Sequence, residues 1–259
     1  MISVALTIAG SDPSGGAGIQ ADLKTFHQMG VYGMSVITLL TVQNTQRVDR
    51  VEPLDPELVM RQLDAVLEDI PPQATKTGAL GSLGIIEALA QKVSGFSFPL
   101  VVDPVMTSKH GKLLLDPKAL DAFKRRLLPY AYLVTPNIHE AAVLSGQTLE
   151  DEESIKEAAR VIAGFGPKAV LIKGGHRPKK ATDLLYFENQ FYTYSEARIE
   201  TSRTHGTGCT FSAAITAELA KGRGLMEAVK VAKKFVTCAI RTAPCLGHGI
   251  GPVNHQARV

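Results

Sequence analysis

The segment MISVALTIAGSDPSGGAGIQADLKTFHQM, residues 1–29, decides the fold because it joins an apolar run, a glycine-rich loop and a stretch with helical spacing of apolar residues. We interpret residues 1–9 as a strand, residues 10–18 as the loop and residues 19–29 as a helix. A glycine loop that follows a strand and opens a helix lies at the carboxyl edge of a parallel sheet, where α/β proteins bind ligands. The opening segment therefore predicts an α/β fold with a ligand site at that edge.

The same alternation of strand and helix patterns continues along the chain. Apolar, β-branched runs predict further strands at residues 34–42, 99–105, 132–136 and 169–175. Helical periodicity predicts helices at residues 57–70, 83–93, 117–128, 139–144, 154–165, 208–221 and 227–243. Such alternation is typical of βαβ units, in which a mostly parallel sheet has helices on both faces.

Residues 183–200, DLLYFENQFYTYSEARIE, differ from the rest, because Tyr and Phe alternate around a Glu-Asn-Gln turn. This pattern predicts antiparallel strands at the edge of the otherwise parallel sheet. No linker rich in Pro, Gly or Ser interrupts the alternation, so we expect a single domain over residues 1–259.

The composition disfavours several classes of protein. Hydrophobic residues make up 45% and charged residues 20% of the chain, and no stretch approaches the roughly 18 apolar residues that a membrane span needs. The N-terminus lacks the pattern of a secretory signal, and Cys209, Cys238 and Cys245 have no metal-ligand spacing, so we expect a soluble cytoplasmic protein. The net charge of +3 comes from scattered basic residues, including 124–126 and Lys179-Lys180, which argues against nucleic-acid binding.

The first glycine loop admits several interpretations. Residues 16–21, GAGIQA, match the dinucleotide fingerprint G-x-G-x-x-A, but the acid expected about 20 residues later is missing. The loop also mimics the start of a P-loop, but without the Lys and Ser/Thr that end one. A turn without a ligand is a further alternative. We favour a loop whose backbone approaches a small polar substrate, with Asp12 and Gln43 available to bind it.

A second glycine loop, residues 205–210 with the sequence HGTGCT, precedes an amphipathic helical segment. Glycines permit close backbone approach, and the free amides at a helix N-terminus favour a phosphate oxyanion. Cys209 is a candidate base for a substrate hydroxyl, because a helix N-terminus lowers the pKa of a thiol. The alternatives are an ordinary helix N-terminus and, for Cys209, a small packed residue.

Polar side chains also follow three other predicted strands. Asp103 ends one strand, Asn137 and Glu140 follow the next, and Lys173 ends a third. Oxygen ligands at one edge suit a Mg²⁺ that bridges phosphates, and a lysine there neutralises a transferring phosphoryl group. Asn137 and Glu140 fit a helix capping box equally well, and Lys173 fits a surface turn. Phosphoryl transfer to a small molecule is the reaction that uses all of these groups.

Seven segments resemble the hydroxymethylpyrimidine and phosphomethylpyrimidine kinases of thiamine biosynthesis: LTIAGSDPSGGAGIQADLKTF, VQNT, DPVM, TPN-x-x-E, KGGH, HGTGCT and GHGIGPV. The resemblance spans nearly the whole chain. It implies a ribokinase-like fold, a three-layer α/β/α sandwich with a mostly parallel central sheet and antiparallel edge strands. It also implies ATP as the phosphoryl donor, a need for Mg²⁺, a homodimer, and phosphorylation of 4-amino-5-hydroxymethyl-2-methylpyrimidine to the monophosphate and then to the diphosphate.

The resemblance also implies roles for individual positions. Gln43 is similar to the pyrimidine-recognition residue, and the rest of the substrate wall would comprise Gly10, Asp12, Ala17, Asp22, Ala79 and Val105. The catalytic group would comprise Gly206, Thr207, Gly208, Cys209 and Lys173, of which 206–209 are similar to the family's anion hole. The nucleotide would contact Asn137, Lys173 and Thr207, and Mg²⁺ would lie near Glu140 and Asp103.

Two positions bear on the identity of the substrate. Related sugar kinases have an Asp that acts as the base where this chain and the thiamine branch have Cys209. A weaker base than Asp is tolerable in the thiamine branch, because the acceptor of the second phosphorylation is an already ionised phosphate that needs no deprotonation. The family commonly has Met where this chain has Ala79, so a contact to the pyrimidine is removed and the pocket enlarged. A pyridoxal or pyridoxine kinase is therefore the alternative function. A binding protein without activity is disfavoured because the catalytic residues are present, and a nicotinamide oxidoreductase because the ribose-binding acid is absent.

Overall fold

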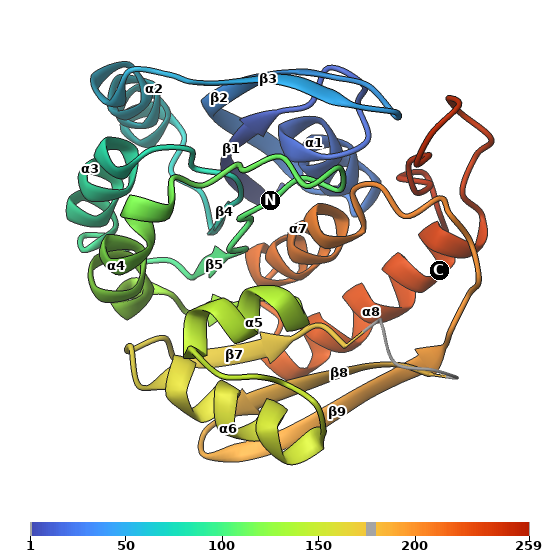
Figure 1. Ribbon diagram of the computed structural model, residues 1–259. Coiled ribbons are helices and arrows are strands. Elements are labelled where there is room, and N and C mark those ends of the chain that lie inside the picture. Colours follow the sequence, from blue (N-terminus) through green and yellow to red (C-terminus); the bar gives the residue numbers. More distant parts are fainter. Residues whose placement is uncertain (1, 175–179, 259) are drawn as a thin grey trace.

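Parallel pairing of short, buried strands forms the centre of the molecule. The computed structural model describes residues 2–174 and 180–258, and the nine strands in these residues form one sheet in the order β3-β2-β1-β4-β5-β6-β7-β8-β9 (Figure 1). The parallel strands are β1 (Val4–Ser11), β2 (Tyr32–Gln43), β4 (Ala74–Thr77), β5 (Leu100–Val102), β6 (Leu133–Val134) and β7 (Ala169–Ile172). Gly175, His176 and Lys179, which belong to quoted sequence motifs, lie outside the described residues.

Antiparallel strands close both edges of the sheet. β3 (Val48–Pro53) pairs with β2, and the hairpin of β8 (Lys180–Phe187) and β9 (Gln190–Ala197) pairs with β7. Its turn places Glu188 and Asn189 at φ angles of 51° and 61°, as a two-residue hairpin turn with the twist of the strands requires. The predicted fold class is confirmed, although the hairpin begins at residue 180 rather than 183.

Helices cover both faces because neighbouring strand residues are buried on opposite sides. In β1, Leu6 and Ile8 belong to one core cluster and Ala5 to the other. The first cluster packs under α2 (Pro56–Asp69), α3 (Leu83–Val93), α5 (Ile138–Ser145) and α6 (Glu152–Ala163). The second packs under α1 (Gly18–Gln28), α7 (Thr207–Ala220) and α8 (Leu225–Arg241), and Figure 1 shows α7 beside α8.

The predicted helix at residues 117–128 is broken into short pieces. The 3₁₀ turn Pro117–Ala119 leads into α4 (Leu120–Ala122), then a wider π turn over Phe123–Leu127 and a second 3₁₀ turn over Leu128–Tyr130. This segment still buries its apolar side chains in the first cluster. Within the described residues, no helix is both long and apolar enough to cross a membrane.

The sequence did not predict β3 or β4. β3 reads VDRVEP and is an edge strand with mostly exposed, charged side chains. β4 reads ATKT, and its Lys76 is fully buried. The Lys76 ammonium pairs with the carboxylate of Asp22 from α1 at 2.7 Å, and the Thr7 hydroxyl donates to the same oxygen at 2.6 Å. A charge partner 54 residues away makes a buried lysine compatible with a central strand.

We expect Lys76→Met to lower the free energy of unfolding by about 3–5 kcal/mol, because it leaves the Asp22 carboxylate buried without its partner. The double variant Lys76→Met/Asp22→Asn should recover most of that loss, since neither charge remains. Arg125→Met, which breaks the exposed pair with Asp121, is the matched control and should cost under about 1 kcal/mol. Urea unfolding followed by circular dichroism measures all three, and equal losses from the buried and exposed variants would contradict this reading of the pair.

Candidate active site

A large cavity, of about 1200 Å³, opens at the carboxyl ends of the parallel strands. It is lined by the ends of β1, β2, β4 and β5, the loop after β5, the start of α5 and the start of α7. Every residue proposed for the site from the sequence lines this cavity except Asp22. The placement of ligand-binding groups at this sheet edge therefore follows from the fold.

Asp22 requires a correction. It was expected in the substrate wall, but its side chain is fully buried between the Lys76 ammonium and the Thr7 hydroxyl. Lys76 itself lines the cavity. Asp22 therefore acts on the site through Lys76 rather than by touching a ligand.

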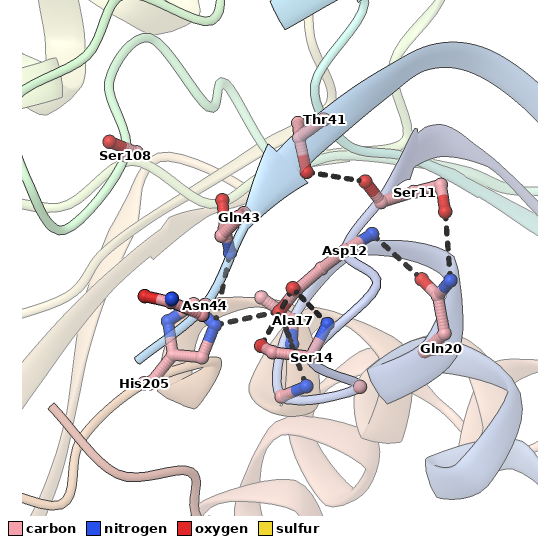
Figure 2. Close-up of polar contacts among 12 residues, drawn as sticks. Ser11, Asp12, Ser14, Ala17, Gln20, Thr41, Gln43, Asn44, Ser108 and His205 are labelled. Atoms are coloured by element: carbon pink, nitrogen blue, oxygen red, sulfur yellow. Dashed lines mark hydrogen bonds and ion pairs between the residues drawn. The ribbon is translucent and has the colours of Figure 1, made fainter. Parts of the chain in front are cut away.

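The carboxylate of Asp12 organises the first glycine loop. One oxygen accepts from the backbone N–H and the hydroxyl of Ser14, and the other accepts from the N–H groups of Gly16 and Ala17 (Figure 2). The second oxygen also lies 2.7 Å from Nε2 of His205. Asp12 lines the cavity, but its carboxylate is already engaged by the loop, which corrects the expectation that it is available to bind substrate.

The two glycine loops touch at their backbones. Gly206 has a φ of +78°, and a Cβ at this position would overlap the carbonyl oxygen of Gly16. A Cβ on Gly16 would in turn overlap the ring of His205. Only glycine allows this approach, which brings the start of α7 over the first loop.

The N-terminus of α7 faces the cavity without a side-chain cap. Its N-cap residue is Gly206, and Thr207, Gly208 and Cys209 follow in the first turn and line the cavity. No side chain bonds the first amides, although the Thr207 N–H donates to the Thr204 carbonyl at 3.3 Å. The N–H groups of Gly208 and Cys209 and the positive end of the helix dipole are available to an anion. This geometry favours the anion-hole interpretation of the loop over an ordinary capped helix.

Lys173 reaches the same helix end. Its ammonium lies 2.8 Å from Oδ1 of Asp103, and a Cβ on Gly208 would come within 3.4 Å of it. Asp103 also accepts hydrogen bonds from the hydroxyls of Thr135 and Ser212. Burial raises the pKa of Asp103, but the charges of Lys173 and Lys76 outweigh it and lower the pKa below its usual value. Lys173 is therefore not a solvated surface lysine, and Asp103 holds it beside the anion hole.

Asn137 and Glu140 form the capping box that was one of the two alternatives for this pair. Asn137 Oδ1 accepts from the Glu140 N–H at 2.9 Å, and Glu140 Oε2 accepts from the Asn137 N–H at 2.8 Å. Both residues line the cavity, so the cap also fixes them at the site. Burial and the nearby Asp103 carboxylate raise the pKa of Glu140 to about 7, although Lys173 opposes this shift.

Asp103 and Glu140 are two electrostatically coupled carboxylates in one cavity. Among residues 2–174 and 180–258, no group of three or more His, Cys, Asp or Glu side chains could enclose a metal ion. One or two carboxylates with phosphate and water oxygens are the usual ligands of Mg²⁺ in phosphoryl-transfer sites. The donor set therefore fits a magnesium ion that arrives with a nucleotide.

Cys209 does not have the acidic thiol that its position suggested. All three cysteines are free, and burial raises the pKa of Cys209 to about 12. Lys76 opposes this rise, and the carboxylates of Asp22 and Asp103 reinforce it. The helix N-terminus does not overcome desolvation here, so the thiol is protonated at neutral pH.

His205, Lys76 and Lys109 also line the cavity, and the sequence analysis gave none of them a role. Lys109 lies in the loop after β5, where burial and the charge of Lys173 lower the pKa of its ammonium. Its surroundings, TSKHGK, look like a solvated loop, so the sequence carries no signal for it. His205 stands directly before a glycine loop, which was a signal for it, whereas Lys76 lies in a strand too short and too polar to predict.

The comparisons with known proteins agree with this geometry. A family described as Phosphomethylpyrimidine kinase matches residues 12–254. The chain belongs to this family. It is 47% identical to the hydroxymethylpyrimidine/phosphomethylpyrimidine kinase of Staphylococcus aureus, with 98% of this chain and 94% of the relative covered.

Two solved structures superpose on this phosphomethylpyrimidine kinase family member. The pyridoxal kinase of Staphylococcus aureus in complex with AMP-PCP and pyridoxal superposes with a TM-score of 0.91 at 40% identity, covering 99% of this chain and 94% of that one. The phosphomethylpyrimidine kinase of Clostridium difficile superposes with a TM-score of 0.80 at 45% identity, covering 91% and 98%. Overall fold therefore does not separate the two substrate classes, and the side chains of the cavity must.

The raised pKa of Glu140 predicts a specific pH dependence of stability. A carboxyl with a higher pKa in the folded than in the unfolded chain stabilises the fold below pH 4.5, and this contribution is lost as the pH rises through about 7. The free energy of unfolding of the wild type should therefore fall by up to about 3 kcal/mol between about pH 5 and about pH 8. Glu140→Gln keeps the cap but has no carboxyl to titrate, so its free energy of unfolding should not show this fall.

Urea unfolding of the ligand-free protein at the two pH values measures this difference. Glu157→Gln, at an exposed position on α6, is the control and should follow the wild type. Parallel behaviour of wild type and Glu140→Gln would show that Glu140 has an ordinary pKa.

Proposed function

We propose that this protein transfers the γ-phosphoryl group of ATP to 4-amino-5-hydroxymethyl-2-methylpyrimidine, and then to the resulting monophosphate, in thiamine biosynthesis. One observation carries the proposal. The cavity holds the hydrogen-bonding carboxamide of Gln43 together with an uncapped helix N-terminus and the Lys173 ammonium. A polar heterocycle and a phosphate chain are what these groups bind, and the family to which the chain belongs supports the same reaction.

Gln43 is the residue proposed to recognise the pyrimidine by hydrogen bonds. A carboxamide offers a donor and an acceptor side by side, and the amino group and adjacent ring nitrogen of the aminopyrimidine offer the complementary pair. Gly10, Ala17, Ala79 and Val105 line the same cavity and supply small or apolar surfaces for the ring. A Cβ on Gly10 would overlap the Leu39 side chain, so glycine allows Leu39 to pack closely against this part of the wall.

The nucleotide lies, in this proposal, between the start of α7 and the start of α5. Amides of residues 206–209 and the Lys173 ammonium stabilise the charge on the transferring phosphoryl group, and Thr207 and Asn137 contact the nucleotide. Glu140 and Asp103 would hold Mg²⁺, which would neutralise charge on the phosphate oxygens. Lys109 also lines the cavity.

The two phosphorylations make different demands on Cys209. In the first, the hydroxyl oxygen of the substrate attacks the γ-phosphorus of ATP, and the bond between that phosphorus and the ADP oxygen breaks. The hydroxyl proton must leave, and the thiolate of Cys209 accepts this proton. In the second, the attacking oxygen belongs to an ionised phosphate and carries no proton. With a pKa of about 12 the thiolate is scarce at neutral pH, so proton removal limits only the first step.

We further infer that residues 1–259 form one kinase domain, located in the cytoplasm and assembled as a homodimer. Leu40 and Val42 support an assembly through β2, because these two large apolar side chains are about half exposed near the end of the strand. Two residues apart on a strand, they share one face of the sheet.

The proposed substrate is tested by an ATP-consumption assay with hydroxymethylpyrimidine, its monophosphate or pyridoxal, with products identified by mass. We expect turnover of both pyrimidines. Pyridoxal is the second candidate, because Ala79 leaves room beside the ring and a pyridoxal kinase superposes closely. Turnover of pyridoxal alone would replace the proposed substrate.

The role of Cys209 is tested by Cys209→Ala. The first phosphorylation should slow by at least about 100-fold, the usual contribution of a general base, whereas the second should change little. In the wild type the first rate should rise as the pH rises from about 7 to about 9, because the thiolate fraction grows with pH below the pKa.

The variant should lose this pH dependence, and the second phosphorylation should lack it in both proteins. Equal losses in the two phosphorylations, or a flat pH profile for the first, would show that the thiol is not the proton acceptor.

A further inference from the structure

His205 stands between the carboxylate of Asp12 and the carboxamide of Gln43. Its Nε2 lies 2.7 Å from Asp12 Oδ2 and 3.3 Å from the nearer terminal atom of Gln43, placed as Nε2 (Figure 2). The imidazole is 5% exposed and Asp12 is 3% exposed. The backbone of His205 is fixed independently by bonds to Gly251 and Val253. A rigid imidazole therefore links the first glycine loop to the end of β2.

The surroundings of Asp12 decide where the imidazole proton lies. Its carboxylate receives bonds from three backbone amides and a hydroxyl, all of which are donors. An ionised carboxylate has no hydrogen to give, so Nε2 of His205 must donate to it. Although burial raises the pKa of Asp12, the bonds from His205 and Ser14 lower it below its usual value, which keeps the carboxylate ionised.

The proton on Nε2 in turn decides the orientation of Gln43. A carboxamide with its nitrogen toward His205 would set two N–H donors against each other. Rotation about the terminal bond exchanges nitrogen and oxygen without changing the shape, and it places an acceptor beside the imidazole N–H. The satisfied arrangement has Gln43 Oε1 toward His205, as a second and longer acceptor (3.3 Å) of the single N–H that Nε2 donates to Asp12 at 2.7 Å, and its NH₂ on the other side.

We propose that His205, held by Asp12, is a positioning residue that locks the Gln43 carboxamide in this orientation and thereby selects an aminopyrimidine over a pyridoxal ring. The inference rests on the proposed role of Gln43 in substrate binding. A locked carboxamide presents its donor and acceptor to the cavity in one fixed order; a free one presents either order.

The two candidate substrates differ in that order. In the aminopyrimidine, the group beside the hydroxymethyl arm is an amino donor, followed by a ring-nitrogen acceptor. In pyridoxal the neighbour of the same arm is an aldehyde, an acceptor, followed by a phenolic hydroxyl. A site that fixes the order of its own donor and acceptor leaves the wrong ring with unmatched polar groups, which is an effective way to reject an analogue.

The tautomer is tested directly by the ¹⁵N chemical shifts of the His205 imidazole in the ligand-free protein. We expect Nε2 to carry the hydrogen. A ring protonated on Nδ1 alone would overturn the inference whether or not the protein phosphorylates a pyrimidine. This measurement therefore separates failure of the inference from failure of the proposed function.

The selectivity is tested with His205→Phe, which keeps a ring but has no N–H. The KM for hydroxymethylpyrimidine should rise about tenfold, the equivalent of about 1.4 kcal/mol. The ratio of kcat/KM for the pyrimidine to that for pyridoxal should fall by a similar factor, and the KM for ATP should change less. In a Gln43→Ala background the same substitution should add nothing, because the two residues act as one unit.

His205→Gln is the matched variant, because its terminal NH₂ can reach the position of Nε2 and donate to Asp12. It should restore most of the selectivity that His205→Phe loses. Equal losses on pyrimidine and pyridoxal, or additive effects of the His205 and Gln43 substitutions, would show that His205 only supports the loop.

Discussion

The hydrogen bond between Asp12 and His205 is the contact on which the site depends. It joins two glycine loops that are 193 residues apart in sequence. The backbones of these loops meet where Gly206 lies against the carbonyl of Gly16, a contact that no side chain permits. The first glycine loop, residues 10–18, thereby packs against the uncapped N-terminus of α7.

Buried charge is the second constraint, and the fold satisfies it in pairs. Asp22 pairs with Lys76, and Asp103 pairs with Lys173. Burial raises the pKa of the Glu140 carboxyl to about 7, and it also raises the pKa of Asp22 despite the charge of Lys76. Buried ion pairs contribute little net stability, because desolvation offsets their attraction. Their value here is geometric, because each holds an ammonium at a defined place beside the cavity. The Glu140 carboxyl, whose pKa is raised, lies where a bound cation would stabilise its ionised form.

Much of this arrangement is predictable from the sequence, because short-range signals encode it. Residues 1–29 indicate their strand, glycine loop and helix through local patterns, and so does the HGTGCT loop. Parallel topology then brings both glycine loops to one edge of the sheet. What the sequence could not show depends on distant partners. Asp22 looked like a wall residue because its partner Lys76 lies in a strand too short and too polar to predict. The thiol of Cys209 looked acidic because desolvation cannot be read from a helix N-terminus alone.

Substrate choice is the property least determined by the fold. The same scaffold serves as a pyridoxal kinase and as a phosphomethylpyrimidine kinase in the solved structures, so the superposition itself carries no information on the ring that is bound. Rings of nearly equal size are separated poorly by apolar walls and well by unmatched polar groups. The polar group that we propose to contact the ring is the Gln43 carboxamide, whose two orientations have the same shape. Specificity must then reside in whatever fixes that orientation, and in this structure the ionised Asp12 does so through the proton on His205.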